Sequence, residues 1–279
     1  GDADIDMSQW HKAEFKLAAR SLLVKNQPIE SINIVVTKQR LVAIALSAEV
    51  SARVELKGEA DAKGWRGTVE RADIDSVRFA NWQLQQSASL TIDQQRFELG
   101  QLCWQNPQQA TFCASVKQGG GWRSSLQLSK LPLMQFKQWL PADLKLDGMA
   151  NASAELLLTE QNRLLGTAQI ELPTASIQYP LLDGELEQWA YRGGQVDMML
   201  DINGLHASAE MAMSNGDHVN AELKLADFNA LEPDIRSSPV QAKASLKVLD
   251  LSLIEALIPE ISKMQGELAM NLSVNGTLA

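Results

Sequence analysis

The residues of this chain that could do chemistry are three histidines, two cysteines and a few closely spaced carboxylates. The histidines, His11, His206 and His218, are scattered, and none has a partner at the spacing of a metal site or a catalytic triad. Asp73 and Asp75 would share one face of a strand, but paired carboxylates alone are weak evidence for glycosidase chemistry. None of these groups predicts an active site.

Sequence motifs for metal binding, phosphate binding and nucleophilic catalysis do not occur in the chain. Asp2, Asp4 and Asp6 have a spacing found in calcium loops, but the glycine and the distal glutamate of such a loop are missing. No nucleophile elbow, glycine-rich phosphate loop or Cys/His cluster is present. The net charge of −9 argues against a nucleic-acid partner. We therefore expect a protein that is not an enzyme, with no cofactor and no metal.

Cys103 and Cys113 stand ten residues apart and flank a turn signal, Asn106-Pro107. A hairpin at this turn would place the two side chains close enough across the strands for a disulfide. Such a bond implies an oxidising compartment. The alternative is a pair of free, buried thiols.

Strict alternation of apolar and polar residues is the dominant pattern and predicts half-buried antiparallel strands. The alternating stretches run over 50–57, 82–92, 195–203, 219–225 and 267–275. Glycines, three of them in Asn-Gly pairs, predict the turns between strands, at Gly64, Gly119-Gly120-Gly121, Gly193-Gly194, Asn203-Gly204, Asn215-Gly216 and Asn275-Gly276. We expect about fifteen to eighteen strands. The predicted fold class is all-β, an elongated and curled antiparallel sheet with two short helices.

The apolar positions of the strands are unusually rich in small and flexible residues. The chain is 45% hydrophobic but only 5% aromatic, and alanine and methionine recur on the expected inward faces. Such side chains fill a tight core poorly and suit a groove that holds something else, such as acyl chains. The residues expected to line it are Val50, Val54, Leu56, Trp82, Leu84, Leu90, Val196, Met198, Leu200, Leu223, Leu268 and Met270. The alternative is an ordinary sandwich with a dry core.

Two helices and an internal repeat complete the predicted architecture. The helices are expected at Pro132–Leu140 and Ser252–Ile258, each lying against the sheet as a plug or brace. Gly64-Trp65-Arg66-Gly67 returns 57 residues later as Gly121-Trp122-Arg123-Ser124. We interpret the chain as one continuous domain, 1–279, with repeat units of roughly 64–120, 121–240 and 241–279.

Several of these elements, in this order, resemble the TamB family, the inner-membrane component of the translocation and assembly module of double-membraned bacteria. The matching elements are Gly64-Trp65-Arg66-Gly67-Thr68-Val69, Trp82-Gln83-Leu84, Leu102-Cys103-Trp104, Phe112-Cys113, Gly121-Trp122, Leu131-Pro132-Leu133, Leu140-Pro141 and Gly148. The stretch from Leu253 to Leu278 is similar to the wider AsmA-like group. The resemblance covers roughly residues 50–279.

The resemblance implies a taco-shaped sheet with an apolar channel. It implies a periplasmic segment of a longer protein, anchored in the inner membrane by an amino-terminal helix that this sequence does not include. It also implies an outer-membrane partner, the Omp85-type barrel TamA, and a role in moving phospholipids toward the outer membrane. No catalytic residue carries over. Our first hypothesis is a conduit for acyl-chain lipids, and the alternative is a scaffold that assists outer-membrane protein assembly by β-augmentation.

Overall fold

The computed structural model describes residues 14–24, 27–37, 39–47, 49–61, 63–76, 81–94, 96–139, 145–180, 186–231, 238–249 and 266–277. The chain forms two compact units, Gly1–Ser125 and Leu126–Ala279. The boundary between them falls inside strand β10 (Trp122–Pro132). Asp2, Asp4, Asp6, His11 and the expected second helix lie outside the described residues. The three repeat units and the single continuous domain stay predictions.

The first unit is an antiparallel meander in which most strands pair with the next strand along the chain. Its strands are β1 (Phe15–Val24), β2 (Gln27–Val36), β3 (Arg40–Leu46), β4 (Val50–Asp61), β5 (Gly64–Ser76), β6 (Gln83–Leu84), β7 (Ala88–Asp93), β8 (Phe97–Gln105) and β9 (Thr111–Gln118). The short β6 interrupts this order, because β5 pairs with β7 while β6 pairs with β8.

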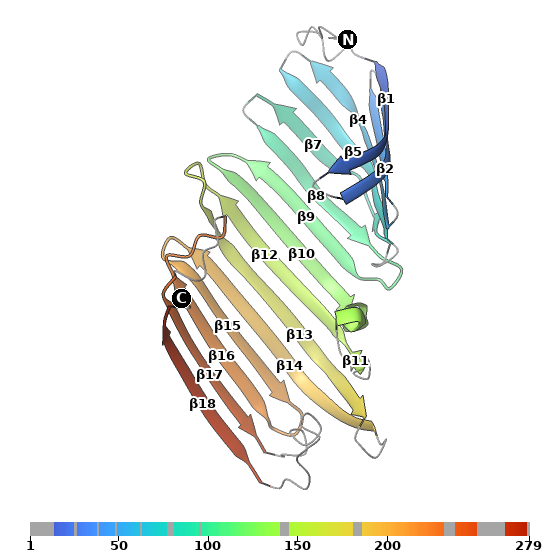
Figure 1. Cartoon of the computed structure of the whole chain (residues 1–279). Helices are drawn as coiled ribbons and strands as arrows, with labels where there is room; N and C mark the ends of the chain where they lie inside the picture. The colour runs from blue at the N-terminus through green and yellow to red at the C-terminus, as the bar shows by residue number, and fades with distance from the viewer. Residues whose placement is uncertain are drawn as a thin grey trace. The chain divides into compact units, whose positions relative to one another are not determined.

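The second unit has the same antiparallel plan, and Figure 1 shows its strands running side by side from β12 to β18. The strands are β11 (Lys145–Asp147), β12 (Met149–Leu158), β13 (Leu164–Pro180), β14 (Leu186–Asp201), β15 (Gly204–Met213), β16 (His218–Ala226), β17 (Val240–Val248) and β18 (Leu268–Gly276). The long β13 pairs with β12 along one part of its length and with β11 along another.

The structure confirms the all-β, antiparallel class and the upper end of the expected strand number, with open, curled sheets (Figure 1). The first expected helix exists, but it is a 3₁₀ helix, η2 (Leu133–Trp139), which begins one residue after Pro132. With seven residues it is longer than the usual 3₁₀ helix of about three or four residues. Leu133 is buried and Phe136 packs beside it against the sheet, as expected for a brace.

Three predictions of local structure were wrong. Gly193-Gly194 is not a turn but lies inside β14, where the register against β15 shifts between Tyr191 and Gly193. A glycine there tolerates the irregular backbone of a bulge. Asn275-Gly276 pairs with β17 as part of β18. The stretch 82–92 is not one strand, because residues 85–87 separate β6 from β7. Asn203-Gly204 and Asn215-Gly216 do mark the predicted turns.

Candidate functional site

The first unit carries one continuous apolar face. Alternation gives each strand an apolar side, and the register brings these sides together. One row of directly opposed residues across five strands consists of Leu17, Ile34, Ala43, Val54 and Ala72. Two further predicted groove residues, Val50 and Leu56, share the face of β4 to which Val54 belongs.

A β-bulge in β5 keeps this face continuous. Val54 pairs with Ala72 but Leu56 pairs with Val69, so β5 contains one residue more than β4 over this stretch. The inserted residue lets Val69 and Ala72 point to the same side although they are three positions apart. Plain alternation would have put one of them on the polar face.

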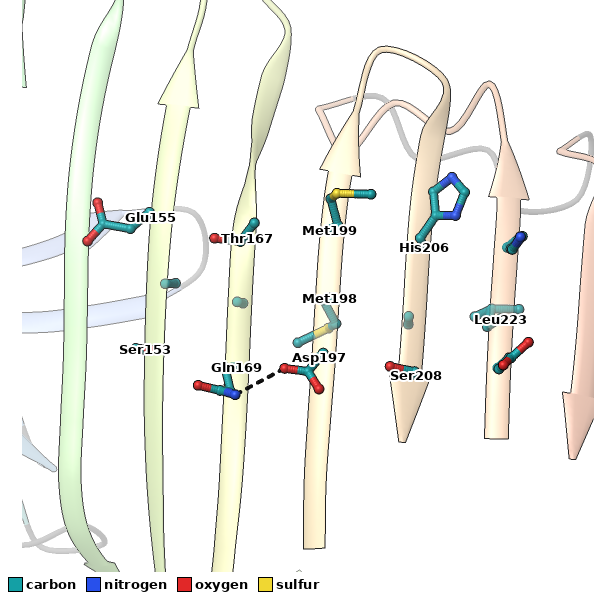
Figure 2. A pocket seen from close by; sticks show the side chains of 15 residues that line it. Ser153, Glu155, Thr167, Gln169, Asp197, Met198, Met199, His206, Ser208 and Leu223 are labelled. Atoms are coloured by element: carbon teal, nitrogen blue, oxygen red, sulfur yellow. Dashed lines mark hydrogen bonds between the residues drawn. The ribbon is translucent and has the colours of Figure 1, made fainter. Parts of the chain in front are cut away.

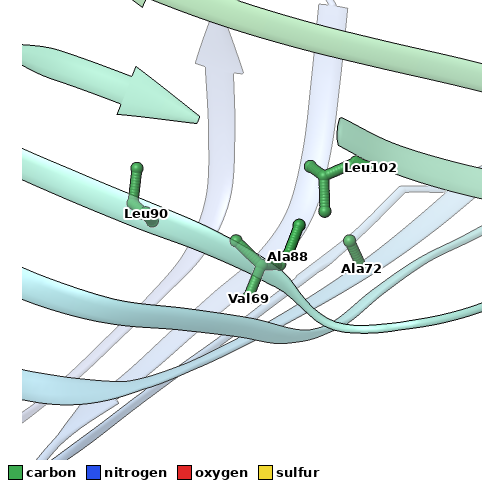
Figure 3. Close-up of a cluster of buried hydrophobic side chains, with 5 residues drawn as sticks. All are labelled: Val69, Ala72, Ala88, Leu90 and Leu102. Atoms are coloured by element: carbon green, nitrogen blue, oxygen red, sulfur yellow. The ribbon is translucent and has the colours of Figure 1, made fainter. Parts of the chain in front are cut away.

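Between β4 and β8 the apolar face is filled by its own side chains (Figure 3). The buried residues, each at most 8% exposed, are Val69, Ala72, Ala88, Leu90 and Leu102. They are packed by Leu56, Trp65, Leu84, Phe97, Leu99 and Trp104. The Trp104 indole crosses the strands and donates a hydrogen bond to the carbonyl oxygen of Ala72. Three predicted groove residues, Leu56, Leu84 and Leu90, therefore belong to a packed cluster.

The opposite face of the first unit carries a buried carboxylate. Glu55 is 5% exposed and accepts hydrogen bonds from the guanidinium groups of Arg40 and Arg53. The Arg40 hydrogen bond is the largest influence on the pKa of Glu55 and lowers it, and burial opposes this effect. The predicted carboxylate pair is structural too, since Asp73 forms an ion pair with Arg71.

The two cysteines form the disulfide that their spacing predicted. Cys103 and Cys113 are directly opposed on β8 and β9 and are bonded. The next pair, Trp104 and Phe112, stacks on the other face of the hairpin with ring centroids 5.6 Å apart. In the turn, the Asn106 side-chain oxygen accepts a hydrogen bond from the backbone N–H of Ala110. Disulfide and aromatic pair thus hold the same hairpin from its two sides.

The second unit also has one apolar face, and it includes six predicted groove residues, whereas Trp82 lies in the first unit opposite Ile74. Val196, Met198 and Leu200 alternate on β14, and Met198 is directly opposite Ala168 on one side and Ala207 on the other. On the strands that follow, the same face holds Leu223, Leu268 and Met270 through the register of β15–β18. The register thus assembles all six onto one side, while their contact with lipid stays a prediction.

Toward β18 this face is open. Leu272 is 54% exposed and Met270 is 48% exposed. Between β14 and β18 the face is hollowed by about 240 Å³, and alanines from three strands form its floor. Ser208, Glu222 and Lys243 also border the hollow, but the alternation of the strands directs their side chains to the other face. The wall presented to an occupant is therefore apolar.

η2 packs against the second unit at a buried cluster of Leu133, Ala150 and Tyr191. Tyr191 is 2% exposed, and its hydroxyl has no hydrogen-bond partner among the described residues. Burial raises the pKa of this hydroxyl, and the nearby charge of Asp147 raises it further. The cluster covers the sheet near β11–β14, away from the alanine floor.

The polar face of the second unit has a hollow of its own, of about 620 Å³ (Figure 2). Asp197 lies in it and accepts hydrogen bonds from the side-chain nitrogens of Gln169 (3.1 Å) and Gln195 (2.7 Å). His206 borders the same hollow without forming part of a metal-binding group. Met198 and Met199, neighbours on β14, point to opposite faces of the sheet and both appear in Figure 2.

Sequence reasoning missed two parts of the apolar faces. The strands β1–β3, with residues such as Leu17 and Ile34, contribute a large apolar surface. Alternation could have revealed β1, but β3 is a continuous apolar run after Arg40 and does not alternate. The roles of Trp65 and Trp104 as covers over the first cluster depend on cross-strand neighbours, and no local pattern marks them.

Metal sites and membrane-spanning helices were also sought in the described part of the chain. It contains no group of three or more histidine, cysteine, aspartate or glutamate residues that could hold a metal ion. No helix among the described residues is long and apolar enough to cross a membrane.

Fold and site together define an antiparallel β protein whose two units each have one apolar and one polar face. A family model described as "TamB, N-terminal domain" matches residues 1–279, so the chain belongs to the TamB family. No curated protein and no solved structure matches it significantly. Proteins of this family are periplasm-spanning inner-membrane components of transport or assembly and are not a known enzyme family.

Proposed function

We propose that this chain holds and conducts the acyl chains of phospholipids, or of other lipids, along its apolar sheet faces and so supports outer-membrane biogenesis. The observation that carries the proposal is the uncharged face of the second unit, where Met270 and Leu272 stay about half exposed beside an apolar hollow. Contiguous exposed apolar surface of this kind marks a binding surface. The proposal assigns no catalytic residue and no cofactor.

The energetics of burial suit an acyl chain that moves along the apolar face. Burial of a chain of about 16 carbons at about 0.8 kcal/mol per CH₂ gives roughly 12 kcal/mol of gross stabilisation. Ordering of the chain and retention of water at the open side reduce this value. Alkyl chains have no polar groups to satisfy, so neighbouring positions on a uniform face differ little in affinity. Small differences in affinity between positions allow a bound chain to move along the face, because no single position holds it tightly.

Family membership supports the placement of the function. We place the segment in the periplasm and assign the inner-membrane anchor to an amino-terminal helix of the full-length protein. The outer-membrane partner of the proposal is a TamA-type barrel, which the family implies. The anchor helix, this periplasmic segment and the barrel together would connect the inner membrane to the outer membrane.

Charge insertion tests the conduit. Leu200→Arg and Leu223→Arg each place a cation on the apolar face, and we expect photo-crosslinking to lipid acyl chains to fall while the fold is retained. The arginine stem can lie along an open wall and its head can reach water. Met199→Arg is the matched control, since Met199 is 45% exposed on the polar face of the same strand as Leu200. Circular dichroism melts report the fold in every variant.

The result that would overturn the conduit is global unfolding of both face variants together with no lipid captured by the parent protein. An unpaired charge in a dry core costs several kcal/mol, so a sandwich core would not survive either substitution.

A scaffold for outer-membrane protein assembly is the second candidate, and β18 favours it. This strand has no charged residue, is almost wholly exposed, and lies at the outside of the second unit in Figure 1. Uncharged outer strands are the ones that accept further strands by β-augmentation. Lys substitutions at Asn271 and Ser273 on the polar face of β18 should impair a scaffold and leave lipid capture by the apolar face intact.

A further inference from the structure

The 3₁₀ helix η2 covers one end of the apolar face of the second unit. Its Leu133 belongs to the buried cluster against which Phe136 of η2 and Met213 of β15 also pack. Met213 lies on the apolar face, because it is an even number of residues from Ala209, which is directly opposite Val196 on β14. η2 is therefore on the same face as the hollow of about 240 Å³, and it closes this end of the face to a ligand.

The contacts that hold η2 on the sheet come from one side of the helix. Leu133 and Phe136 are three residues apart, so they lie on the same side of a helix with three residues per turn. Met134 is 65% exposed and Lys137 is exposed as well. The backbone N–H of Leu133 donates a hydrogen bond to the carbonyl oxygen of Gly148 (3.0 Å). Displacement of η2 would thus lose side-chain packing and this hydrogen bond, but it would break no strand pairing.

Two buried polar groups at the contact oppose the packing of η2 on the sheet. The Tyr191 hydroxyl and the Gln135 side-chain nitrogen are buried and have no hydrogen-bond partner among the described residues. A buried polar group without a partner costs free energy, because water would satisfy it in an exposed state. If η2 left the sheet, both groups could reach water. Apolar packing therefore favours the covered state and the two polar groups disfavour it, as expected of a contact that opens reversibly.

Resting on the proposed lipid function, we propose that η2 is a reversible, autoinhibitory cover of the apolar face. In the closed state Leu133 and Phe136 occupy the end of the face, and a lipid acyl chain that binds there displaces them. Opening adds Leu172, Ile177 and Met213 to the exposed apolar surface. Because lipid binds the uncovered end only when η2 is open, lipid shifts the population toward the open state. η2 thus regulates how much of the face is available.

Hydrogen exchange of the backbone amides of η2 in the full-length protein reports the opening. A helix of seven residues does not persist without its packing, so opening exposes these amides to solvent. Vesicles of phosphatidylethanolamine and phosphatidylglycerol should speed exchange over residues 133–139 and leave exchange in β16 no faster. The same vesicles carry a diazirine on one acyl chain, so lipid adducts on Met198 and Leu223 report the uncovered part of the face.

The two proposals fail in different ways in this experiment. Lipid adducts on Met198 and Leu223 with unchanged exchange in η2 would overturn the cover and leave the conduit standing. No lipid adduct on the apolar face of either unit would overturn both.

Variants at the contact test the direction of the effect without lipid. Tyr191→Phe keeps the ring and removes the unsatisfied hydroxyl, so it favours the closed state and should slow exchange in η2 by about tenfold. Phe136→Ala removes part of the cover, so it should speed this exchange by about tenfold or more and raise lipid adducts on Ile177 and Met213. Met134→Ala is the matched control on the exposed side of η2 and should change neither readout.

A fixed brace predicts different results for the same variants. It predicts that Phe136→Ala unfolds the second unit or lowers the adducts on Ile177 and Met213, and that Tyr191→Phe leaves exchange in η2 unchanged. If Phe136→Ala does not fold, Phe136→Leu should give a smaller increase in exchange and in the same adducts. Unchanged exchange in Tyr191→Phe, or fewer adducts in a folded Phe136 variant, would contradict the proposal.

Discussion

Glu55 shows how the polar face of the first unit is stabilised. Its carboxylate is buried, and it is held by Arg40 from β3 and by Arg53 from β4, both about half exposed. The ion cluster therefore joins two strands, and solvent screens its outer part. Removing the carboxylate leaves two arginines that water can reach, so the penalty is that of lost charged hydrogen bonds and not of a stranded buried charge.

Glu55→Gln should destabilise the chain by about 1–2 kcal/mol at pH 7. Because the folded pKa of Glu55 lies below its ordinary value of 4.5, the carboxylate stabilises the fold above that value, and this stabilisation is lost as pH falls through the folded pKa. Urea unfolding of parent and variant should therefore differ at pH 7, and the difference should shrink as the pH falls below 4.5. Glu59→Gln, an exposed change on the same strand, is the control. A gap that persists undiminished at pH 3 would contradict this assignment.

The Cys103–Cys113 disulfide closes a short loop and should contribute about 3 kcal/mol in the chain-entropy model. Replacement of both cysteines by serine should lower the midpoint of unfolding without abolishing the fold, because the Trp104–Phe112 pair still joins the strands from the other face. Lipid crosslinking should be unchanged, since the disulfide lies on the polar face. Thiol labelling of the denatured, unreduced protein should find no free sulfhydryl, and two labelled thiols would refute the bond.

At the scale of elements, the β4–β5 pair depends on a close contact between two glycines. Gly58 and Gly67 are directly opposed, and the ring of Trp65 lies over both. A Cβ atom added to Gly67 would come within 2.6 Å of the ring and would also meet the backbone of Lys57. Bare glycine is therefore required for the close approach of the tryptophan.

Gly67→Ala should destabilise the first unit by about 1–3 kcal/mol, as overpacking does in a core. Gly119→Ala is the matched control, because an added Cβ there meets no atom within 4 Å. Urea titrations of the two variants, followed by tryptophan fluorescence, make the comparison. Equal midpoints for the two variants would show that the Trp65 contact is dispensable.

Alternation in the sequence predicted strands over 50–57, 195–203, 219–225 and 267–275 and assigned most of their side chains to a face. It works because each strand is buried on one side only, so the pattern Val50, Val54, Leu56 reads directly as a face. It fails at bulges, where one extra residue reverses the alternation, as between Val69 and Ala72 and around Gly193. A local pattern also cannot distinguish a bulge glycine from a turn glycine.

The candidate site could be predicted residue by residue but not as a surface. We expected Met198 and Leu223 to line a groove; the register puts both on the apolar face, and the groove itself stays a prediction. Ala209, Ala221 and Ala244 are directly opposed on β15, β16 and β17. This opposition depends on the register of three strands, which the sequence alone does not give. The sequence also did not predict that the face around Leu90 is packed by other side chains, because residues such as Trp65 and Trp104 reach it from other strands.

At the scale of the whole molecule, the two units use one plan with different fillings. The first unit packs tryptophan and phenylalanine over Leu90 and its neighbours, and so supplies its own core. In the second unit, alanines of β15, β16 and β17 line the hollow of the apolar face, and Leu272 is exposed. An account in which the protein carries lipid therefore predicts that lipid contacts concentrate on β14–β18 and are sparse over the cluster at β4–β8.

The measurement that tests this account most directly compares two neighbouring residues with the same side chain. A photo-reactive amino acid is placed at Met198, and separately at Met199, in the full-length protein in living cells. These positions lie on opposite faces of one strand, so fold, expression and location are matched. We predict lipid adducts from position 198 and none above background from position 199. Equal lipid capture from both positions, or protein adducts alone from position 198, would contradict the claim that the apolar face carries lipid.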